Sequence, residues 1–345
     1  MDRLTIEKIN VHSEAGLKVE TFLSTFDLVL DKDVEYTVVI KDKNEIIGTC
    51  SYAGNVIKCF AVKKGLQQGG IAGKLITHIT DVLFHKGIYK TFIFTKPLNA
   101  MILEGLNYRK VHETKYVVLL EGGLANVERT IKKMFEQSGL GIRKKAALVM
   151  NCNPFTWGHR YLIEEASKEN EEVVVFVVEE NRSLFPFKTR LELVKKGTAD
   201  LKNVHVLAGG EYIISSATFP SYFLRQEDER LEGYVNLDAG IFGKYIAPAF
   251  HVDKRYVGTE PYCKVTNQYN EALSNILPRY GVEVRKIKRL TAEEKNISAS
   301  VVRGLIKNEN WEEVKKLVPQ TTYEFLISHD AEEIVERIKR KDCPH

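Results

Sequence analysis

The stretch from Asn153 to His159 constrains the fold of this chain more than any other. It directly follows the apolar run Ala146–Met150 and directly precedes a helical pattern, so the sequence indicates a strand, a tight turn and a helix. The turn places small residues, a hydroxyl and an imidazole at a helix start, where unpaired backbone N–H groups and the helix dipole favour a phosphate. We therefore expect a phosphate-binding loop at the end of a strand.

A second loop of the same kind lies far downstream, from Ile297 to Arg303. Two hydroxyl residues, Ser298 and Ser300, open a predicted helix there, and the arginine lies one turn in. Strands and helices alternate around these loops: strands are predicted at 173–178, 204–207, 256–258 and 282–287, and helices at 188–196 and 264–277. This alternation predicts a doubly wound parallel sheet, an α/β fold, with both loops at the carboxyl ends of strands, where such sheets bind ligands.

The two loops carry the patterns Thr-x-Gly-His and Ile-Ser-x-Ser-x-x-Arg, and this region resembles the adenylyl-transferring nucleotidyltransferase superfamily. The resemblance implies ATP as a substrate that is attacked at its α-phosphorus. That reaction requires positioning and neutralisation of charge on the departing pyrophosphate, and no covalent residue. The implied catalytic residues are His159, Thr156 and Arg303, and the implied ATP-binding residues are Asn153, Pro154, Phe155, Gly158, Gly258, Glu260, Ile297, Ser298 and Ser300.

Each of these residue types suits a part of the reaction. We expect His159 to donate to the region between the α- and β-phosphates and Thr156 to bond phosphate oxygens. Ser298 and Ser300 can hold the β- and γ-phosphates, and Arg303 supplies a fixed fork for the leaving charge. The superfamily more often has histidine where this chain has Thr156, a substitution that keeps the phosphate site. The alternative interpretation is a helix-capping histidine and simple N-cap serines.

Three further features have two interpretations each. Gly258 could admit adenosine and Glu260 could accept from ribose hydroxyls, or the two could form a plain turn at a strand end. Lys188 and Arg190 could hold an anionic substrate, or be solvated charges at a helix start. Asp238 is either a helix cap or a polar group that lines the site.

The first part of the chain has a different pattern. Strands rich in β-branched and aromatic residues at 36–40, 46–50 and 56–62 precede a glycine-rich loop and a helix that runs to about residue 85. The order strand, Gln-x-x-Gly-x-Ala, helix, strand resembles the GNAT acetyltransferase family, in which this loop grips acetyl-CoA. Gln67, Gly70 and Ala72 are the residues so implied, although such a loop is also a common tight connection. Whether this part binds acetyl-CoA stays open.

The length of 345 residues suits two domains. We predict a GNAT-like α+β domain over residues 1–121, a linker helix within 122–145, and a nucleotidyltransferase domain with a helical C-terminal tail over 146–345. The paired glycines Gly122 and Gly123, which end an apolar strand, mark the first boundary.

Composition excludes several classes of protein. The net charge of +4 is too slight to predict nucleic-acid binding, and no apolar segment approaches the roughly 18 residues of a membrane span. The start of the chain lacks a signal-peptide core, so we expect a cytoplasmic protein. Five scattered cysteines include no Cys-x-x-Cys pair, which predicts reduced thiols and no zinc site. We expect Mg²⁺ to be required but bound mainly through the phosphates of ATP, with no dedicated protein metal site.

Longer stretches narrow the resemblance to the citrate lyase ligase family. They are residues 153–162, 183–187, 215–220 and 257–263, and the GNAT-like part matches as well, so the resemblance covers nearly the whole chain. Cys152 departs from it, since a smaller or less reactive residue such as alanine is expected there. The family implies that acetate attacks ATP to give acetyl-adenylate and pyrophosphate. The prosthetic-group thiol of the acyl carrier subunit of citrate lyase then takes the acetyl group, which activates the lyase.

Two other functions remain open at this point. One is a dinucleotide-forming adenylyltransferase that acts on pantetheine phosphate or nicotinamide mononucleotide. The other is a non-catalytic module that senses acyl-CoA and nucleotide. The basic run Arg285–Arg289 likewise has two interpretations: a solvated strand end, or a rim that steers an acidic acyl carrier protein.

Overall fold

The computed structural model describes residues 5–66, 70–214, 219, 223–224, 227–259, 264–288, 291–292 and 295–340. The chain divides into two compact units. Unit 1 comprises Met1–Thr130 and Pro220–Leu237, and unit 2 comprises Ile131–Phe219 and Asp238–His345. Unit 1 therefore includes a segment from the second half of the sequence. The domain limits expected from the sequence stay a prediction.

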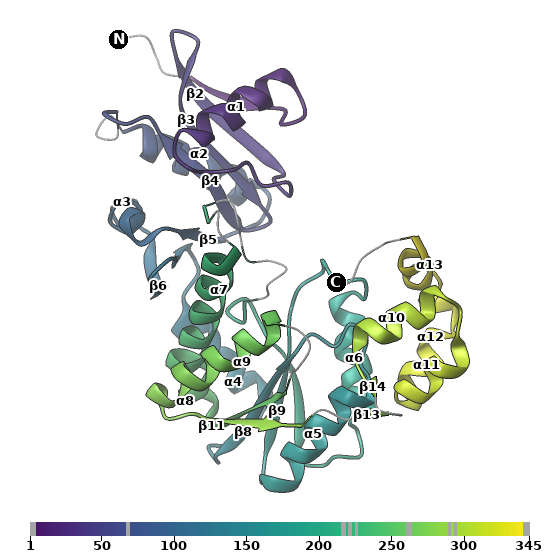
Figure 1. Cartoon of the computed structure of the whole chain (residues 1–345). Helices are drawn as coiled ribbons and strands as arrows, with labels where there is room; N and C mark the ends of the chain where they lie inside the picture. Colours follow the sequence, from purple (N-terminus) through teal and green to yellow (C-terminus); the bar gives the residue numbers. More distant parts are fainter. Residues whose placement is uncertain are drawn as a thin grey trace. The chain divides into compact units, whose positions relative to one another are not determined.

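Unit 1 is built on a seven-stranded sheet with the strand order β1-β2-β3-β4-β5-β7-β6. Neighbouring strands are antiparallel except β4 and β5, which are parallel. Figure 1 shows α1 and α2 beside this sheet. The elements are β1 (Ile6–Ile9), α1 (Glu14–Ser24), β2 (Tyr36–Asp42), β3 (Glu45–Ala53), β4 (Val56–Val62), α2 (Ile71–His85), β5 (Lys90–Thr95), α3 (Ala100–Glu104), β6 (Arg109–Glu113) and β7 (Val118–Gly123).

Strands β4 and β5 diverge after a short paired stretch. Val56 pairs with Phe92 and Ile57 with Ile93, and these two fully described strands have no further paired residues. Helix α2 buries Leu75 and Ile79 in the core of this unit. Gly70, whose φ of +72° is a left-handed conformation open to glycine, directly precedes that helix.

Unit 2 is built on a five-stranded sheet with the order β10-β9-β8-β11-β12, in which every neighbouring pair is parallel. The chain starts in the middle at β8, extends to β10 on one side and then returns to β11 and β12 on the other. The elements are β8 (Lys145–Met150), α5 (Trp157–Glu169), β9 (Val173–Val177), α6 (Phe187–Gly197), β10 (Val204–Ala208), α8 (Ala247–Phe250), β11 (Val252–Gly258), α9 (Lys264–Ile276) and β12 (Glu283–Ile287). Two helices, α4 (Val127–Ser138) and α7 (Glu227–Ile241), are shared between the units.

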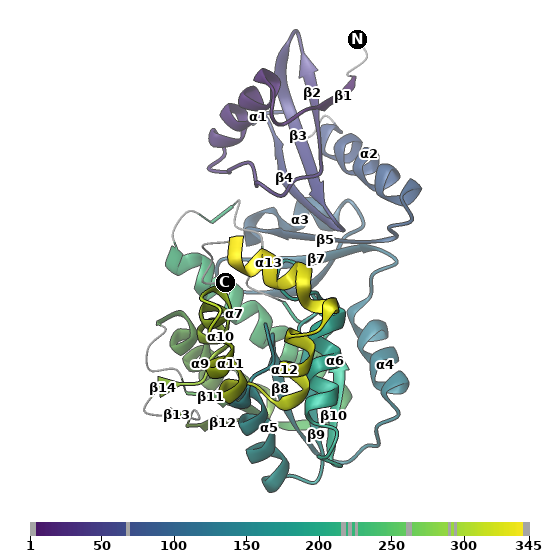
Figure 2. The same ribbon diagram turned by 90° about the vertical axis from the view of Figure 1, so that its right-hand side faces the viewer.

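The C-terminal part of unit 2 is helical. It begins with a two-stranded ribbon, β13 (Thr291–Ala292) and β14 (Lys295–Asn296), followed by α10 (Ala299–Lys307), α11 (Trp311–Leu317), α12 (Gln320–Leu326) and α13 (Glu332–Arg340). Figure 2 shows α12 beside α6, and these two helices are in contact.

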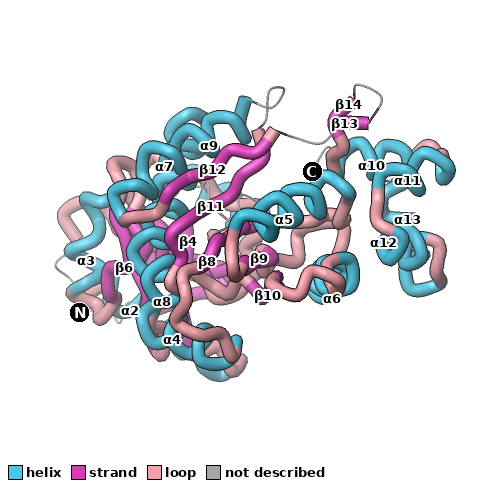
Figure 3. The backbone as a smooth tube through the Cα atoms, turned by 90° about the horizontal axis from the view of Figure 1, so that it is seen from below, coloured by secondary structure: helices cyan, strands magenta, loops and turns pink. Residues whose placement is uncertain are grey.

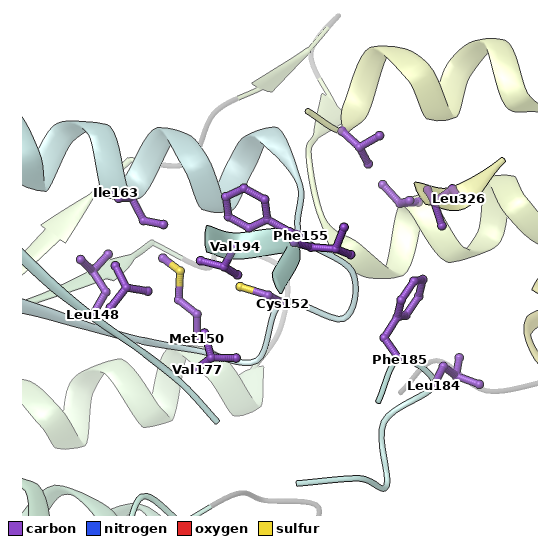
Figure 4. Packing of buried hydrophobic residues seen from close by; sticks show 14 of the residues in the cluster. Leu148, Met150, Cys152, Phe155, Ile163, Val177, Leu184, Phe185, Val194 and Leu326 are labelled. Carbon is purple, nitrogen blue, oxygen red and sulfur yellow. The ribbon is translucent and has the colours of Figure 1, made fainter. Parts of the chain in front are cut away.

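The parallel sheet separates two layers of helices, and Figure 3 shows α5 and α6 on one side of it and α8 and α9 on the other. The first layer shares a core with the C-terminal helices. Figure 4 shows Phe155, Cys152 and Val194 packed together in that core, with Leu326 of α12 nearby. On the second side, Phe176 of β9 contacts Phe242 and Phe250 at ring-centroid distances of 6.4 Å and 5.0 Å.

The predicted fold class is confirmed, since a largely antiparallel sheet is followed by a doubly wound parallel one. Strand β11 starts at Val252, four residues before the predicted strand at 256, and α7 was not predicted. Asp238 lies inside α7 and is therefore not the helix cap that the sequence favoured. Over the described ranges, no helix combines the length and the apolar character that a bilayer span needs.

Candidate active site

The first loop ends in a cap that orients His159. Thr156 is the N-cap of α5 and has an extended backbone, with φ of −128°. Its backbone N–H donates to Nδ1 of His159 at 3.1 Å, its Oγ1 lies 2.8 Å from the same nitrogen, and this Oγ1 accepts from the His159 N–H at 3.4 Å. Because Nδ1 accepts a backbone N–H, the proton of a neutral imidazole resides on Nε2, which makes that atom a donor.

The Thr156 side chain is fully buried, and its hydroxyl is engaged with His159. The sequence suggested that this hydroxyl bonds phosphate oxygens directly. In the structure it instead holds the imidazole and the first turn of α5 in place, which is a positioning role.

The second loop also begins with a side-chain cap. Ser298 is the N-cap of α10, and its Oγ accepts from the Val301 N–H at 3.3 Å. Ser300 Oγ lies 2.9 Å from Ser298 Oγ, and the Ser300 side chain is exposed. Two hydroxyls and the first N–H groups of α10 thus lie at one helix start, an arrangement that suits an anion.

The fold brings the two loops into contact although they are far apart in the sequence. A Cβ on Gly158 would lie 2.6 Å from the Ile297 carbonyl oxygen, so only glycine allows this close approach. Arg303 donates from Nη1 to the carbonyl oxygen of Asn153 at 2.6 Å. Arg303 is 7% exposed, so its guanidinium links the two loops and does not project into solvent. This differs from the expected fork open to the leaving group.

A packed layer beneath the first loop fixes its shape. Phe155 is fully buried and lies parallel to the His159 ring, at 6.0 Å between centroids. Gly197 of α6 makes room for it, because a Cβ there would lie 2.5 Å from the Phe155 ring. Asn153, which precedes Pro154 through a cis peptide bond, accepts the Phe185 N–H on its side-chain oxygen at 3.1 Å.

Two family models match parts of this chain. A family model described as the citrate lyase ligase C-terminal domain matches residues 145–326, and one for the GNAT acetyltransferase family matches residues 6–101. The [citrate [pro-3S]-lyase] ligase of Haemophilus influenzae is 36% identical over 332 residues, which cover 94% of this chain and 98% of that protein. This chain belongs to the citrate lyase ligase family.

Other relatives agree with that assignment. The [citrate [pro-3S]-lyase] ligase of Escherichia coli is 34% identical over 333 residues, 93% of this chain and 94% of that protein. A phosphopantetheine adenylyltransferase of Corynebacterium efficiens is 25% identical over 162 residues, 42% of this chain and 97% of that protein. The homology to citrate lyase ligases supports a ligase role for this chain, and the GNAT-like character predicted for the first part is confirmed.

Arg190 in this citrate lyase ligase family member has a different role from the one expected. Its side chain is fully buried. Its N–H groups donate to the carbonyl oxygens of Phe185, Asn151, Val178 and Glu180, and the guanidinium pairs with the Glu180 carboxylate at 3.3 Å. Burial lowers the pKa of Arg190, and Glu180 opposes that shift. Arg190 therefore braces the segment after β9 against the first loop, and its expected contact with an anionic substrate is not supported. Lys188, which shares that expectation, is exposed near the start of α6.

Of the remaining predicted site residues, some have a described position and others do not. Gly258 ends β11, and its carbonyl oxygen accepts from Asn270 Nδ2 at 2.8 Å. Ala72 is 8% exposed in the first turn of α2, two residues after the N-cap Gly70. Glu260 and Gln67 lie outside the described residues. In the ranges that the structure describes, no three His, Cys, Asp or Glu side chains gather as a metal site would require.

Two buried charged residues, Glu180 and Arg255, were missed by sequence reasoning. Glu180, which forms an ion pair with Arg190, was not singled out from the sequence. Arg255 is 2% exposed on β11, and the predicted strand began one residue after it. The signal for Arg255 was its spacing: it lies two residues before Val257, so both point to the same face of a buried strand.

Proposed function

We propose that this protein is an AMP-forming ligase that activates acetate with ATP and passes the acetyl group to a thiol. The thiol is the prosthetic group of the acyl carrier subunit of citrate lyase, and its acetylation activates the lyase. The observation that carries the proposal is the contact between the two loops, through Gly158 with Ile297 and Arg303 with Asn153. This contact brings two helix starts together, which supports a shared anion site in a chain that belongs to the citrate lyase ligase family.

In the first step a carboxylate oxygen of acetate attacks the α-phosphorus of ATP. The bond from that phosphorus to the α,β-bridging oxygen breaks, and pyrophosphate leaves with the electron pair. We assign to His159 donation from Nε2–H toward the bridging oxygen, where negative charge develops. Ser298, Ser300 and the N–H groups that begin α10 would hold the β- and γ-phosphates. Arg303 acts by fixing the first loop, and its positive charge lies close behind the phosphates.

In the second step the carrier thiol, as thiolate, attacks the carbonyl carbon of acetyl-adenylate. A thioester forms, and AMP leaves with the electrons of the broken C–O bond. Gly258 and Glu260 are proposed to contact the adenosine half, and Lys188 is proposed to attract an anionic group at the edge of the site. The acyl-CoA loop suggested by Gln67, Gly70 and Ala72 stays a proposal for the GNAT-like part.

Mg²⁺ is proposed to accompany ATP and to neutralise phosphate charge. Its ligands would come mainly from the phosphates, because the described residues offer no carboxylate cluster that could hold the ion alone.

Exchange of labelled pyrophosphate into ATP tests the function. The ligase predicts exchange that depends on acetate. The second candidate, a dinucleotide-forming adenylyltransferase, is favoured by the match to a phosphopantetheine adenylyltransferase. It predicts exchange that depends on pantetheine phosphate or nicotinamide mononucleotide and not on acetate. A module that only senses acyl-CoA and nucleotide predicts no exchange with any of these compounds.

A further inference from the structure

Arg255 is a buried cation, and two of its three guanidinium nitrogens have no hydrogen-bond partner in the described part of the chain. The residue is 2% exposed, and its Nε and Nη1 have no hydrogen-bond partner in the described structure. Its guanidinium lies 4.3 Å from the centroid of the Phe242 ring. Burial without partners is costly for a charged group, so an acceptor at this place would be bound strongly.

Asp238, a buried carboxylate that the Arg255 charge affects, has its own hydrogen-bond partners. Asp238 accepts the Ile214 N–H on Oδ1 at 3.1 Å and the Tyr269 hydroxyl on Oδ2 at 2.6 Å. Burial raises the pKa of Asp238, and the opposing effect of the Arg255 charge does not cancel that rise. Asp238 and Arg255 therefore attract each other, while the unpartnered N–H groups of the arginine stay available to another acceptor.

This cluster, formed by Arg255, Asp238 and Tyr269, is tied to the edge of the sheet where ligands bind. Ile214 follows the carboxyl end of β10, and Asn270, next to Tyr269, donates to the carbonyl oxygen of Gly258 at the carboxyl end of β11. Strand β11 pairs with β8, and the chain reverses its direction of strand addition between these two strands. Doubly wound sheets bind ligands at this switch point.

The cluster also lies on the correct face for a nucleophile. The neighbouring Tyr256 points toward α5 and donates to Glu169 of that helix, so Arg255 points to the opposite face, where Phe242 lies. The helix starts that we assign to phosphate binding are those of α5 and α10. Both helices pack into the hydrophobic core on the face of the sheet to which Tyr256 points. In-line displacement places the nucleophile opposite the leaving group. If pyrophosphate leaves on the face of the sheet that α5 and α10 cover, the nucleophile approaches from the opposite face, where Arg255 lies.

We propose that Arg255 binds the carboxylate of the small monocarboxylic acid that attacks ATP, with Asp238 and Tyr269 as positioning residues. One carboxylate oxygen accepts from the guanidinium, and the other forms the new bond to the α-phosphorus as the bond to pyrophosphate breaks. No proton needs to move in this step. The proposal rests on the proposed ligase function and names its acid-binding residue.

The test compares Arg255→Met and Arg255→Lys with the wild type in acetate-dependent pyrophosphate exchange. We expect Arg255→Met to raise the KM for acetate roughly 10- to 100-fold, since a hydrogen bond to a charged group is lost, while the KM for ATP changes little. Arg255→Lys, which keeps the charge, should fall between the two. Lys145→Met is the matched control. Lys145 is a buried cation at the amino end of β8, 1% exposed, and its removal should not change the KM for acetate.

A second measurement separates acid binding from a purely structural role. Acetate, added with a non-hydrolysable ATP analogue, should raise the melting temperature of the wild type and of Lys145→Met but not of Arg255→Met. Asp238→Asn keeps the acceptor for the Ile214 N–H but removes the charge that attracts Arg255, so it should raise the KM for acetate, though less than Arg255→Met does. Unchanged KM values for acetate in both Arg255 variants, with an active wild type, would overturn this assignment alone. A wild type without acetate-dependent exchange would instead overturn the proposed function.

Discussion

At the scale of single residues, the site depends on how one imidazole is held. His159 lies at the third position of α5, and the N–H of Thr156 fixes which ring nitrogen accepts and which donates. Phe155 supports the ring from one side. For the proposed displacement at phosphorus by a carboxylate, which requires no general base, we assign to His159 donation from Nε2 rather than proton abstraction.

Replacing His159 by alanine should therefore slow adenylate formation and leave the fold intact. A donor at developing transition-state charge is typically worth roughly 10²–10³ in rate. The measurement is acetate-dependent pyrophosphate exchange, with circular dichroism and the melting temperature as checks on folding. A folded variant with near-normal exchange would remove His159 from the catalytic residues.

Chelation of divalent metal should abolish exchange, and added Mg²⁺ should restore it. The reason is our proposal that the phosphates of ATP supply most of the ligands of the ion, as is usual for Mg²⁺ bound with a nucleotide. Binding of the metal without nucleotide should accordingly be weak by calorimetry. Tight stoichiometric binding of Mg²⁺ to the protein alone would contradict this expectation.

At the scale of elements, the essential feature is the contact between the start of α5 and the residue before α10. Gly158 and Ile297 approach so closely that no larger residue fits, and Arg303 completes the link. Each helix start alone is an ordinary capped terminus. We propose that their contact makes one site of the two loops.

Gly158→Ala should disturb this contact. The added methyl group meets the Ile297 carbonyl oxygen, and forced overpacking typically costs about 1–3 kcal/mol. We expect a lower melting temperature and a marked loss of exchange. Gly304→Ala is the matched control, because a Cβ in that part of α10 meets nothing within 4 Å, and alanine favours a helix by about 0.8–1 kcal/mol over glycine. Equal behaviour of the two variants would show that the close approach is unimportant.

The sequence predicted these elements where a local pattern dictated them. The apolar runs of β8 and β9 and the capped starts of α5 and α10 are encoded within a few residues each. Helix α7 was missed because its apolar residues show no clear helical periodicity. Its two glycines, Gly233 and Gly240, also make the segment a poor helix former by sequence. The role of Arg190 was also hidden, since its partners come from four separate positions that only the folded chain brings together. The local sequence likewise does not distinguish Arg255 from a solvated arginine, because its burial arises only in the folded chain.

At the scale of the whole molecule, the two units are interleaved in sequence. Residues Pro220–Leu237 belong to unit 1, and Gly233 of α7 lies within 3.6 Å of Val117 and Tyr116, measured from the position of a Cβ. A simple cut of the chain at the predicted linker would therefore remove part of unit 1.

Binding of a macromolecular partner is also a property of the whole molecule. The exposed Lys286 and Lys288 flank the end of β12, an edge strand of the parallel sheet, and Arg285 is paired with Glu283 at 3.0 Å. Arg289 of the same run lies outside the described residues. If these lysines steer an acidic acyl carrier protein, their charges act mainly on the rate of encounter, which falls as salt rises.

Reversing both charges in Lys286→Glu/Lys288→Glu should weaken acetyl transfer to the carrier protein and leave acetate-dependent exchange nearly unchanged. The same reversal at the exposed Lys132 and Lys133 of α4 serves as the control and should affect neither reaction. Equal loss of both reactions in the β12 variant would place these lysines in the nucleotide site or the fold. If neither reaction is impaired, these lysines are ordinary solvated surface residues with no role in carrier binding.

The central claim is that the assembled loops transfer the adenylyl group of ATP to acetate. Pyrophosphate exchange into ATP by the purified protein, measured with acetate, pantetheine phosphate and nicotinamide mononucleotide in parallel, tests it most directly. We predict exchange with acetate and none with either phosphate compound. Exchange that requires one of those two compounds and ignores acetate would contradict the claim.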